Sequence, residues 1–244
     1  MNVAIHPQNT TSILLTGAVI QSHRHLEKNG IQNPFERLTD YLCAISRWLA
    51  QPEITHVVYC DASGILIPEM VFENKKFESL SADFRSTTLT YGKGPSESRT
   101  IEYVMSHSSR LSGNFYKCTG RLFVRNFASI HHGLDQTQGG FVIRMNPQMQ
   151  DADTRFFWFD RTEYFRSIRP HLHENFDYHG CILEHVYYRY CRRFTNMPEI
   201  ELVGRSGHTG RVYLEDYSPE EKETAGELIR TYRLLKNPTI RWKE

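Results

Sequence analysis

Short apolar runs alternate along the chain with segments in which apolar residues recur every three or four positions. The runs at residues 12–20, 54–60 and 86–91 predict buried strands, because strands covered on both faces read as nearly continuous apolar stretches. Between the first two, residues 34–49 carry apolar side chains at helical spacing behind a favourable N-cap, Asn33. This order of strand, helix and strand predicts an α/β fold with a central, mostly parallel sheet flanked by helices.

The same alternation continues to the end of the chain. A helix is expected at residues 101–111, and a central strand within residues 114–126. Beyond them the pattern predicts strands at residues 140–145, 154–160, 200–203 and 212–214, and helices at residues 161–168, 176–193 and 218–236. The last helix has the clearest start, because Ser218, Pro219 and Glu221 supply the cap, the first position and the acid of a capping box. No repeat or linker interrupts the pattern, so we expect residues 1–244 to form one domain.

Composition excludes several classes of protein. Lys and Arg total 29 against 28 for Asp and Glu, so the net charge of +1 gives no overall electrostatic case for a nucleic-acid partner. Five cysteines without a C-x-x-C pair argue against a disulfide framework or a zinc knuckle and fit a reducing cytosol. No N-terminal signal segment and no apolar run of about 18 residues is visible. We therefore expect a cytoplasmic protein, with the inner face of the membrane as the one place for peripheral association.

A basic segment ends the central apolar run. Lys117-Cys118-Thr119-Gly120-Arg121 combines two cations, a hydroxyl and a glycine, the groups that hold a phosphate. Because ligands of open α/β sheets bind at strand ends, we predict that Lys117, Thr119 and Arg121 contact a diphosphate. The alternative is a hairpin turn that carries solvated charges.

Two Gly-rich loops are further candidates for anion binding. The turn at residues 92–97 would offer free N–H groups and a helix dipole to an anion, although the full dinucleotide and P-loop spacings are missing. The loop at residues 204–211 is predicted to close over a diphosphate as a lid. The predicted nucleotide contacts in the first loop are Gly92, Lys93, Gly94 and Glu97, and the predicted diphosphate contacts in the second are Ser206, His208 and Thr209. Ordinary loops, the second a long hairpin connection, are the alternatives.

Five short motifs follow one another in a recognisable order. They are Arg37-x-x-Asp40-Tyr41, Tyr59-Cys60-Asp61-Ala62-Ser63-Gly64, Gly92-Lys93-Gly94-Pro95-Ser96-Glu97, Lys117-Cys118-Thr119-Gly120-Arg121 and Gly180-Cys181-Ile182-Leu183-Glu184-His185. In this order the chain resembles bacterial glycosyltransferase-like proteins of surface-polysaccharide loci, which have a single-domain nucleotide-sugar-binding fold of the GT-A type.

The resemblance implies where a donor would bind. In a GT-A transferase the first strand and the loop after it hold the nucleotide, which would place Thr16, Gly17, Ala18 and Asp61 around the base and ribose. Capping of a later helix is the alternative for Asp61. The implied partners are a nucleotide sugar and a glycan or lipid-linked glycan acceptor of capsule or lipopolysaccharide biosynthesis, with no nucleic acid.

The resemblance also bears on metal dependence. The Asp-x-Asp metal motif of the GT-A fold is replaced at the corresponding place by the basic segment after the central strand, so we expect fixed cations to stabilise the leaving diphosphate and a divalent metal not to be required. Asp151 and Asp153, which lie before a predicted strand, are the alternative metal ligands.

Glu184 is the predicted catalytic residue. An inverting glycosyl transfer needs a carboxylate that takes the proton of the acceptor hydroxyl, and Glu184 is the acid of the last motif. A solvated helix glutamate is the alternative. The leading function is therefore transfer of a sugar from a nucleotide sugar to a glycan hydroxyl. The alternatives are a non-catalytic module that binds a nucleotide or phosphorylated glycan, and a nucleotidyltransferase.

Overall fold

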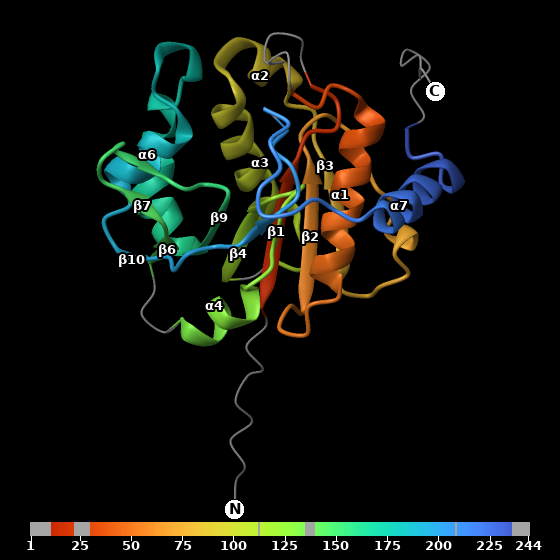
Figure 1. Ribbon diagram of the computed structural model, residues 1–244. Helices are drawn as coiled ribbons and strands as arrows, with labels where there is room; N and C mark the ends of the chain where they lie inside the picture. Colours follow the sequence, from red (N-terminus) through yellow and green to blue (C-terminus); the bar gives the residue numbers. More distant parts are fainter. Residues whose placement is uncertain (1–10, 22–29, 112, 135–139, 208, 236–244) are drawn as a thin grey trace, which may run out of the picture.

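The computed structural model describes residues 11–21, 30–111, 113–134, 140–207 and 209–235, which form a layered α/β fold (Figure 1). Its centre is a seven-stranded sheet in the order β10 (Phe194–Asn196), β6 (Phe141–Ile143), β9 (Phe156–Asp160), β4 (Asn114–Thr119), β1 (Ser12–Gly17), β2 (His56–Asp61) and β3 (Phe77–Ser81). Neighbouring strands pair in parallel except at β9, which runs antiparallel to both β4 and β6. The predicted fold class, a mostly parallel sheet flanked by helices, is confirmed.

Two short antiparallel pairs lie outside this sheet. β5 (Phe123–Val124) pairs with β11 (Leu202–Val203), and β7 (Met145–Asn146) pairs with β8 (Asp151–Ala152) to form a hairpin. The central strands β1, β2 and β4 are buried along nearly their whole length. Burial on both faces explains why they read as continuous apolar runs.

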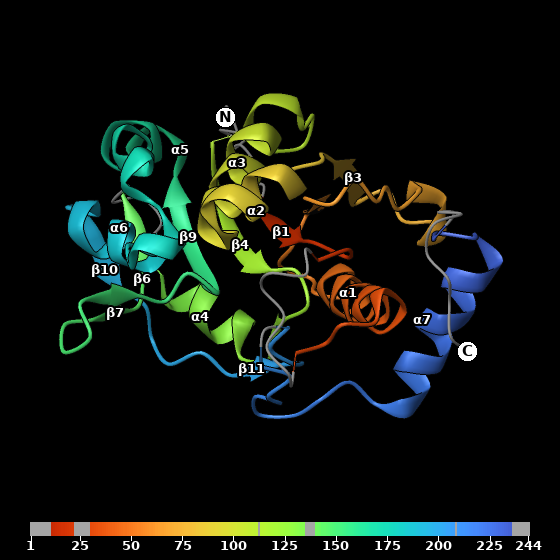
Figure 2. The same ribbon diagram turned by 90° about the horizontal axis from the view of Figure 1, so that it is seen from above.

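Helices cover both faces of the sheet (Figure 2). They are α1 (Pro34–Leu49), α2 (Arg85–Tyr91), α3 (Lys93–His107), α4 (Phe127–Gly133), α5 (Arg161–Glu163), α6 (Leu183–Tyr190) and α7 (Pro219–Thr231). Apolar residues of α1, α4 and α7 share one core with Ile13 and Leu15 of β1, while those of α3 and α6 share a second core with Leu14. Successive strand residues point to opposite faces, so one sheet serves both cores. Within the described ranges, no helix has both the length and the apolar character needed to cross a membrane.

Two helix starts follow their sequence signals. The Asn33 side chain accepts a hydrogen bond from the Phe35 backbone N–H at 2.9 Å at the start of α1. At α7 the Ser218 and Glu221 side chains and backbones form the predicted capping box. The C-terminal helix therefore begins where expected and ends at Thr231.

Residues 86–91 are helical, and the predicted strand there is wrong. The run of threonines favoured a strand by its β-branched side chains. In α2 the hydroxyls of Thr88 and Thr90 donate to carbonyl oxygens four residues earlier, at 3.2 and 2.9 Å, which accommodates them in a helix. The third strand of the chain is β3, whose sequence Phe-Glu-Ser-Leu-Ser is too polar to stand out.

The helix predicted at residues 176–193 is shorter than expected. Before α6 the chain forms a 3-10 turn, η6 (Asp177–His179), and Gly180 adopts a left-handed conformation with φ of 79°. Glu184 therefore lies in the first turn of α6 and not in the middle of a long helix. Of residues 212–214, only Val212 takes part in an isolated bridge, with Arg205, so the predicted strand is wrong.

Candidate functional site

A cavity of about 160 Å³, termed here the first cavity, lies at the carboxyl ends of the central strands. Thr16 and Gly17 end β1 at its wall, Ala62 follows β2, and Thr119 ends β4. Residues from the first turns of α3, from Lys93 onwards, form another part of the lining. The first cavity therefore brings together the ends of three neighbouring strands and the start of one helix.

The topology of the sheet explains this position. From β1 the chain moves outwards through β2 and β3, and it then returns to place β4 on the other side of β1. The connections that leave β1 and β4 therefore diverge, which opens a crevice between them. In open α/β sheets, ligands bind in such a crevice, at the point where the strand order reverses.

The first cavity gathers part of the predicted donor site. The predicted residues that line it are Thr16, Gly17, Ala18, Lys93, Glu97 and Thr119. Those that do not line it are Asp61, Gly92, Gly94, Lys117, Arg121, Ser206 and Thr209, while His208 lies outside the described residues. Close packing requires glycine at residue 17, because a Cβ there would stand 2.8 Å from the hydroxyl of Tyr59.

Asp61 is directed into the protein, where it joins two loops. Its Oδ1 accepts hydrogen bonds from the backbone N–H and hydroxyl of Ser63 and from Ile65 N–H, at 2.7, 2.6 and 3.1 Å. Its Oδ2 accepts from Val19 N–H at 2.9 Å and from the Tyr59 hydroxyl at 3.1 Å. Burial raises the pKa of the carboxyl group, and the hydrogen bonds oppose that rise. With no exposed surface, the carboxylate positions loops in place of the predicted ribose contact, and it caps no later helix.

The N–H groups that begin α3 already hold an anion from this chain. The backbone N–H groups of Lys93 and Gly94 donate to Oδ2 of Asp177 at 2.6 and 3.0 Å. Gly92 has φ of 111°, and a Cβ on it would stand 2.4 Å from the Asp177 carboxyl group. The turn thus has the anion-binding character predicted for it, but a carboxylate from η6 occupies the place predicted for a phosphate.

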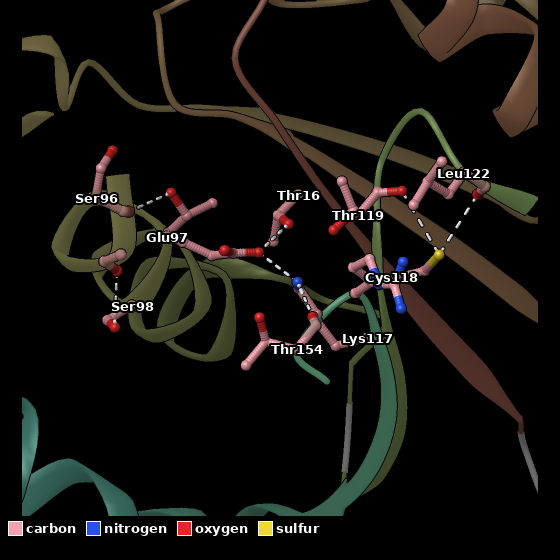
Figure 3. Close-up of polar contacts among 12 residues, drawn as sticks. Thr16, Ser96, Glu97, Ser98, Lys117, Cys118, Thr119, Leu122 and Thr154 are labelled. Carbon is pink, nitrogen blue, oxygen red and sulfur yellow. Dashed lines mark hydrogen bonds and ion pairs between the residues drawn. The ribbon is translucent and has the colours of Figure 1, made fainter. Parts of the chain in front are cut away.

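Lys117 is at the centre of a buried polar chain (Figure 3). Its ammonium group pairs with the Glu97 carboxylate and donates to the backbone carbonyl of Thr154 at 2.7 Å. The Thr16 hydroxyl donates to the same oxygen of Glu97, Oε1, at 3.0 Å. Lys117 has no exposed surface, so it holds Glu97 at the wall of the first cavity and does not itself face a ligand there.

Arg121 is also buried, and Arg205 and Gly207 of the predicted lid loop pack against it. Its Nη1 donates to the backbone carbonyl of Arg205 at 3.2 Å, and a Cβ on Gly207 would overlap its guanidinium group. Arg205 in turn forms an ion pair of 3.0 Å with the buried Asp40 of α1. Arg205 and Gly207 are therefore fastened to the body of the protein in this structure, and closure of the loop over a diphosphate stays a prediction.

A larger cavity of about 880 Å³, termed the second cavity, lies beside the β7–β8 hairpin and the first turn of α6. Glu184 lines it, and the Thr154 hydroxyl donates to Glu184 Oε1 at 2.8 Å. Burial raises the pKa of the Glu184 carboxyl group, and the bond from Thr154 opposes that rise. The other charged residues around this cavity are Arg144, Asp151, Asp153 and Arg155. A carboxyl group with a raised pKa inside a cavity is the arrangement expected of a general base or acid.

Asp151 and Asp153 also line the second cavity, but they do not fit a metal site. Both oxygens of Asp153 accept hydrogen bonds from Arg155, from Nε at 2.8 Å and from Nη2 at 2.5 Å. Among the described residues, no group of three or more His, Cys, Asp or Glu side chains is placed to hold a metal ion. Mg²⁺ and Mn²⁺ need several oxygen ligands, and one free carboxylate does not supply them. Independence from metal remains a prediction from the sequence.

Several residues of the first cavity were not assigned a role from the sequence. Arg37 and Tyr41 of α1 line it, and Arg37 donates from Nε and Nη2 to the carbonyl oxygen of Ala18 at 2.9 and 2.6 Å. Both residues belong to the first motif of the resemblance, Arg37-x-x-Asp40-Tyr41. Arg85 of α2 lines the cavity as well, but the reading of its neighbours as a strand concealed it.

No known family model matches the sequence, and no curated protein matches it. Solved structures with a similar course of the chain include transferases of two kinds. The galactosyltransferase LgtC, solved with donor and acceptor sugar analogs, has a TM-score of 0.46 and 7% identity over 76% of this chain and 73% of its own. The inositol-1-phosphate CTP transferase of T. maritima has a TM-score of 0.49 and 9% identity over 90% and 96%. The glycosyltransferase GlyE of Streptococcus pneumoniae has a TM-score of 0.45 and 8% identity over 77% and 45%. At identities this low, the similarities concern the fold alone.

Proposed function

We propose that the protein is a glycosyltransferase that moves a sugar from a nucleotide-sugar donor to a hydroxyl group of a glycan acceptor. The observation that carries the proposal is the connection of two cavities by one chain of polar contacts through the buried Lys117. Thr16, at the end of β1, and Glu97 of α3 line the first cavity. Glu184 lines the second cavity. A transferase needs both a donor site and a base near the acceptor, and this arrangement supplies a place for each.

The donor is assigned to the first cavity. Its strand-end position suits the nucleotide. The cations on its wall are Lys93 and Arg85, and a diphosphate would compete with Asp83 for the Arg85 guanidinium group, which pairs with Asp83 at 2.6 Å. The same cations would stabilise the charge that develops on the diphosphate as the sugar leaves. Glu97 and the threonine hydroxyls of the wall are suitable partners for ribose or sugar hydroxyls.

The acceptor hydroxyl is assigned to the second cavity. Its oxygen attacks the anomeric carbon of the donor sugar, the bond from that carbon to the diphosphate oxygen breaks, and Glu184 takes the hydroxyl proton. The nucleoside diphosphate leaves. Because Thr154 donates to Oε1 of Glu184, Oε2 is the oxygen assigned to the proton. The raised pKa makes this carboxylate a stronger base than an ordinary glutamate.

The wider role follows from the resemblance of the motifs. It supports a glycan or lipid-linked glycan acceptor in capsule or lipopolysaccharide biosynthesis, on the cytoplasmic side of the membrane with at most peripheral association. It supports no role for nucleic acid, and no step of the proposal needs a metal ion.

A panel of nucleotide sugars tests the proposal. UDP-, GDP-, dTDP-, ADP- and CMP-linked sugars are added one at a time, and thermal unfolding is recorded. A ligand at a hundredfold excess over its Kd stabilises the folded state by about 2.7 kcal/mol, which raises Tm by several degrees. We expect at least one donor to do so and to be hydrolysed slowly to the free nucleotide.

The other outcomes separate the competing functions. Stabilisation by a nucleotide sugar without release of nucleotide, even with added glycans, would indicate a binding module. Release of pyrophosphate from a nucleoside triphosphate would indicate a nucleotidyltransferase. The absence of any stabilisation across the panel would contradict the proposed function.

A further inference from the structure

The two cavities are linked by a chain of contacts between residues from five separate segments. On the side of the first cavity, Glu97 Oε1 accepts a hydrogen bond from the Thr16 hydroxyl and pairs with the Lys117 ammonium group. On the side of the second cavity, Lys117 donates to the carbonyl oxygen of Thr154, whose hydroxyl donates to Glu184. Lys117 therefore contacts both Glu97, at the wall of the first cavity, and Thr154, which holds Glu184.

Burial of this lysine is costly for stability alone. The Lys117 side chain is 1% exposed, and an ammonium group taken out of water loses hydration that one ion pair only partly replaces. An apolar pair of similar volume would stabilise a fold as well or better. Buried ionic groups that fold stability does not require point to a role in arranging the groups around them.

We propose that Lys117 and Glu97 are a positioning pair, which holds Glu184 in place through Thr154 and makes it respond to what fills the first cavity. The inference rests on the proposed function in taking Glu184 as the base. Lys117 fixes the backbone of Thr154, and the Thr154 hydroxyl fixes which oxygen of Glu184 is free. A ligand that binds the Thr16 hydroxyl or Glu97 alters the contacts that Glu97 makes with Thr16 and Lys117. The charge of Lys117 is then compensated differently, and the proton affinity of Glu184 changes.

The charges around Glu184 set the direction of each effect. Lys117 and the bond from Thr154 favour its ionised form, whereas Glu97 and burial favour its protonated form. The titratable and charged groups that face it from the surrounding elements are Glu97 of α3, Lys117 of β4, Tyr187 of α6, and Arg144, Asp151, Asp153 and Arg155 around the second cavity. Glu97 and Lys117 thus act on Glu184 with opposite signs.

The test is a carboxyl titration of the whole protein by NMR with ¹³C-labelled glutamate. The Glu184 resonance is the one that disappears in Glu184→Gln. Loss of the bond from Thr154 in Thr154→Val should raise the Glu184 midpoint by about 0.5 to 1 pH unit. Glu97→Gln should lower it, and Lys117→Met should raise it. Glu102→Gln is the matched control, because Glu102 lies on the same helix and pairs with the exposed Arg169 outside both cavities.

A second arm adds UDP, GDP, dTDP or ADP, each alone, to the wild type and to Glu97→Gln. The nucleotide that binds should move the Glu184 midpoint in the wild type and move it less in Glu97→Gln. Equal movement in both, or midpoints unchanged in Glu97→Gln and Thr154→Val, would overturn the inference. If Lys117→Met does not fold, these two conservative variants still decide it. If no nucleotide binds, the proposed function fails, while the titrations without nucleotide still decide whether the pair acts on Glu184.

Discussion

The two cavities differ in how they are built. The first is made from strand ends and the start of α3, elements whose positions follow from the winding of the sheet. The second is made from the β7–β8 hairpin, the residues that lead from it into β9, and Glu184 in the first turn of α6. Under the proposed function, the sheet would place the donor, whereas the hairpin and α6 would supply the base. Variants in each cavity should therefore fail in different ways, as loss of binding or as loss of turnover.

The largest effect is expected at Glu184. Glu184→Gln keeps the shape of the side chain but removes the base, so the transfer rate should fall by about 10² to 10⁴ because proton transfer in the transition state contributes that much. Donor affinity, which belongs to the first cavity, should stay within about twofold of the wild type under the same reasoning. The check is a paired measurement of donor Kd and transfer rate. A mutant with a near-normal rate would exclude Glu184 as the base.

The cations of the first cavity give the next largest effect. Arg85→Gln removes a charge on the cavity wall, and loss of a charge-assisted contact to a diphosphate should weaken donor binding by about tenfold to a hundredfold. Arg121→Ala should act mainly on Tm, because Arg121 is buried under Gly207 and does not line the cavity. Calorimetry on both variants, with the exposed Arg125→Gln as control, measures this. A larger loss of affinity in Arg121→Ala than in Arg85→Gln would restore the diphosphate contact predicted from the sequence.

Gly92→Ala tests the turn that begins α3 at the edge of the first cavity. The residue has φ of 111°, and a Cβ would stand 2.4 Å from the Asp177 carboxyl group, so unfolding should become easier by about 1 to 3 kcal/mol or more. Gly113→Ala is the matched control, since Gly113 has φ of 69° with no atom within 4 Å of an added Cβ. Denaturant unfolding of the two should show the larger loss at Gly92. Equal losses would mean that the contact with Asp177 is unimportant.

The smallest effect concerns pH. Glu184 must be ionised to act as a base, and burial raises its pKa, so the transfer rate should rise with pH along a limb that lies above the ordinary glutamate range near about 4.3. A raised pKa in the folded state has the opposite effect on stability: the free energy of unfolding falls as the pH rises from that range through the raised pKa, and it changes no further above it. Glu184→Gln should lack this fall. A rate limb at or below the ordinary range would contradict the assignment.

The sheet and the first cavity were largely predictable, because they depend on local patterns. The apolar runs identified β1, β2 and β4. Strand-end reasoning indicated Thr119, the Gly-rich turn indicated Lys93 and the resemblance implied Thr16, and all three line the first cavity. The motif of the resemblance had already singled out Glu184. The apolar spacing predicted one helix at residues 176–193. It did not indicate that a 3-10 turn and the left-handed Gly180 come first, so that Glu184 lies in the first turn of α6.

Contacts between residues far apart in the sequence explain the remaining differences between the predicted and the observed site. The turn at Gly92 was recognised as an anion site, but its occupant, Asp177, lies 84 residues from the N–H of Lys93 along the chain. Lys117 has the positive charge that a phosphate ligand needs. Its ammonium group instead pairs with Glu97 inside the protein. A single sequence specifies the chemical character of such groups, and only the folded chain decides which partner satisfies them.

The central claim, that the first cavity holds the nucleotide and the second the acceptor, is tested most directly by a crystal structure with the bound nucleoside diphosphate. We expect density for the diphosphate in the first cavity, beside the Lys93 and Arg85 side chains, with the base near the loop after β1. The second cavity should stay free of nucleotide. Density for the nucleotide in the second cavity, against Glu184, would contradict the account.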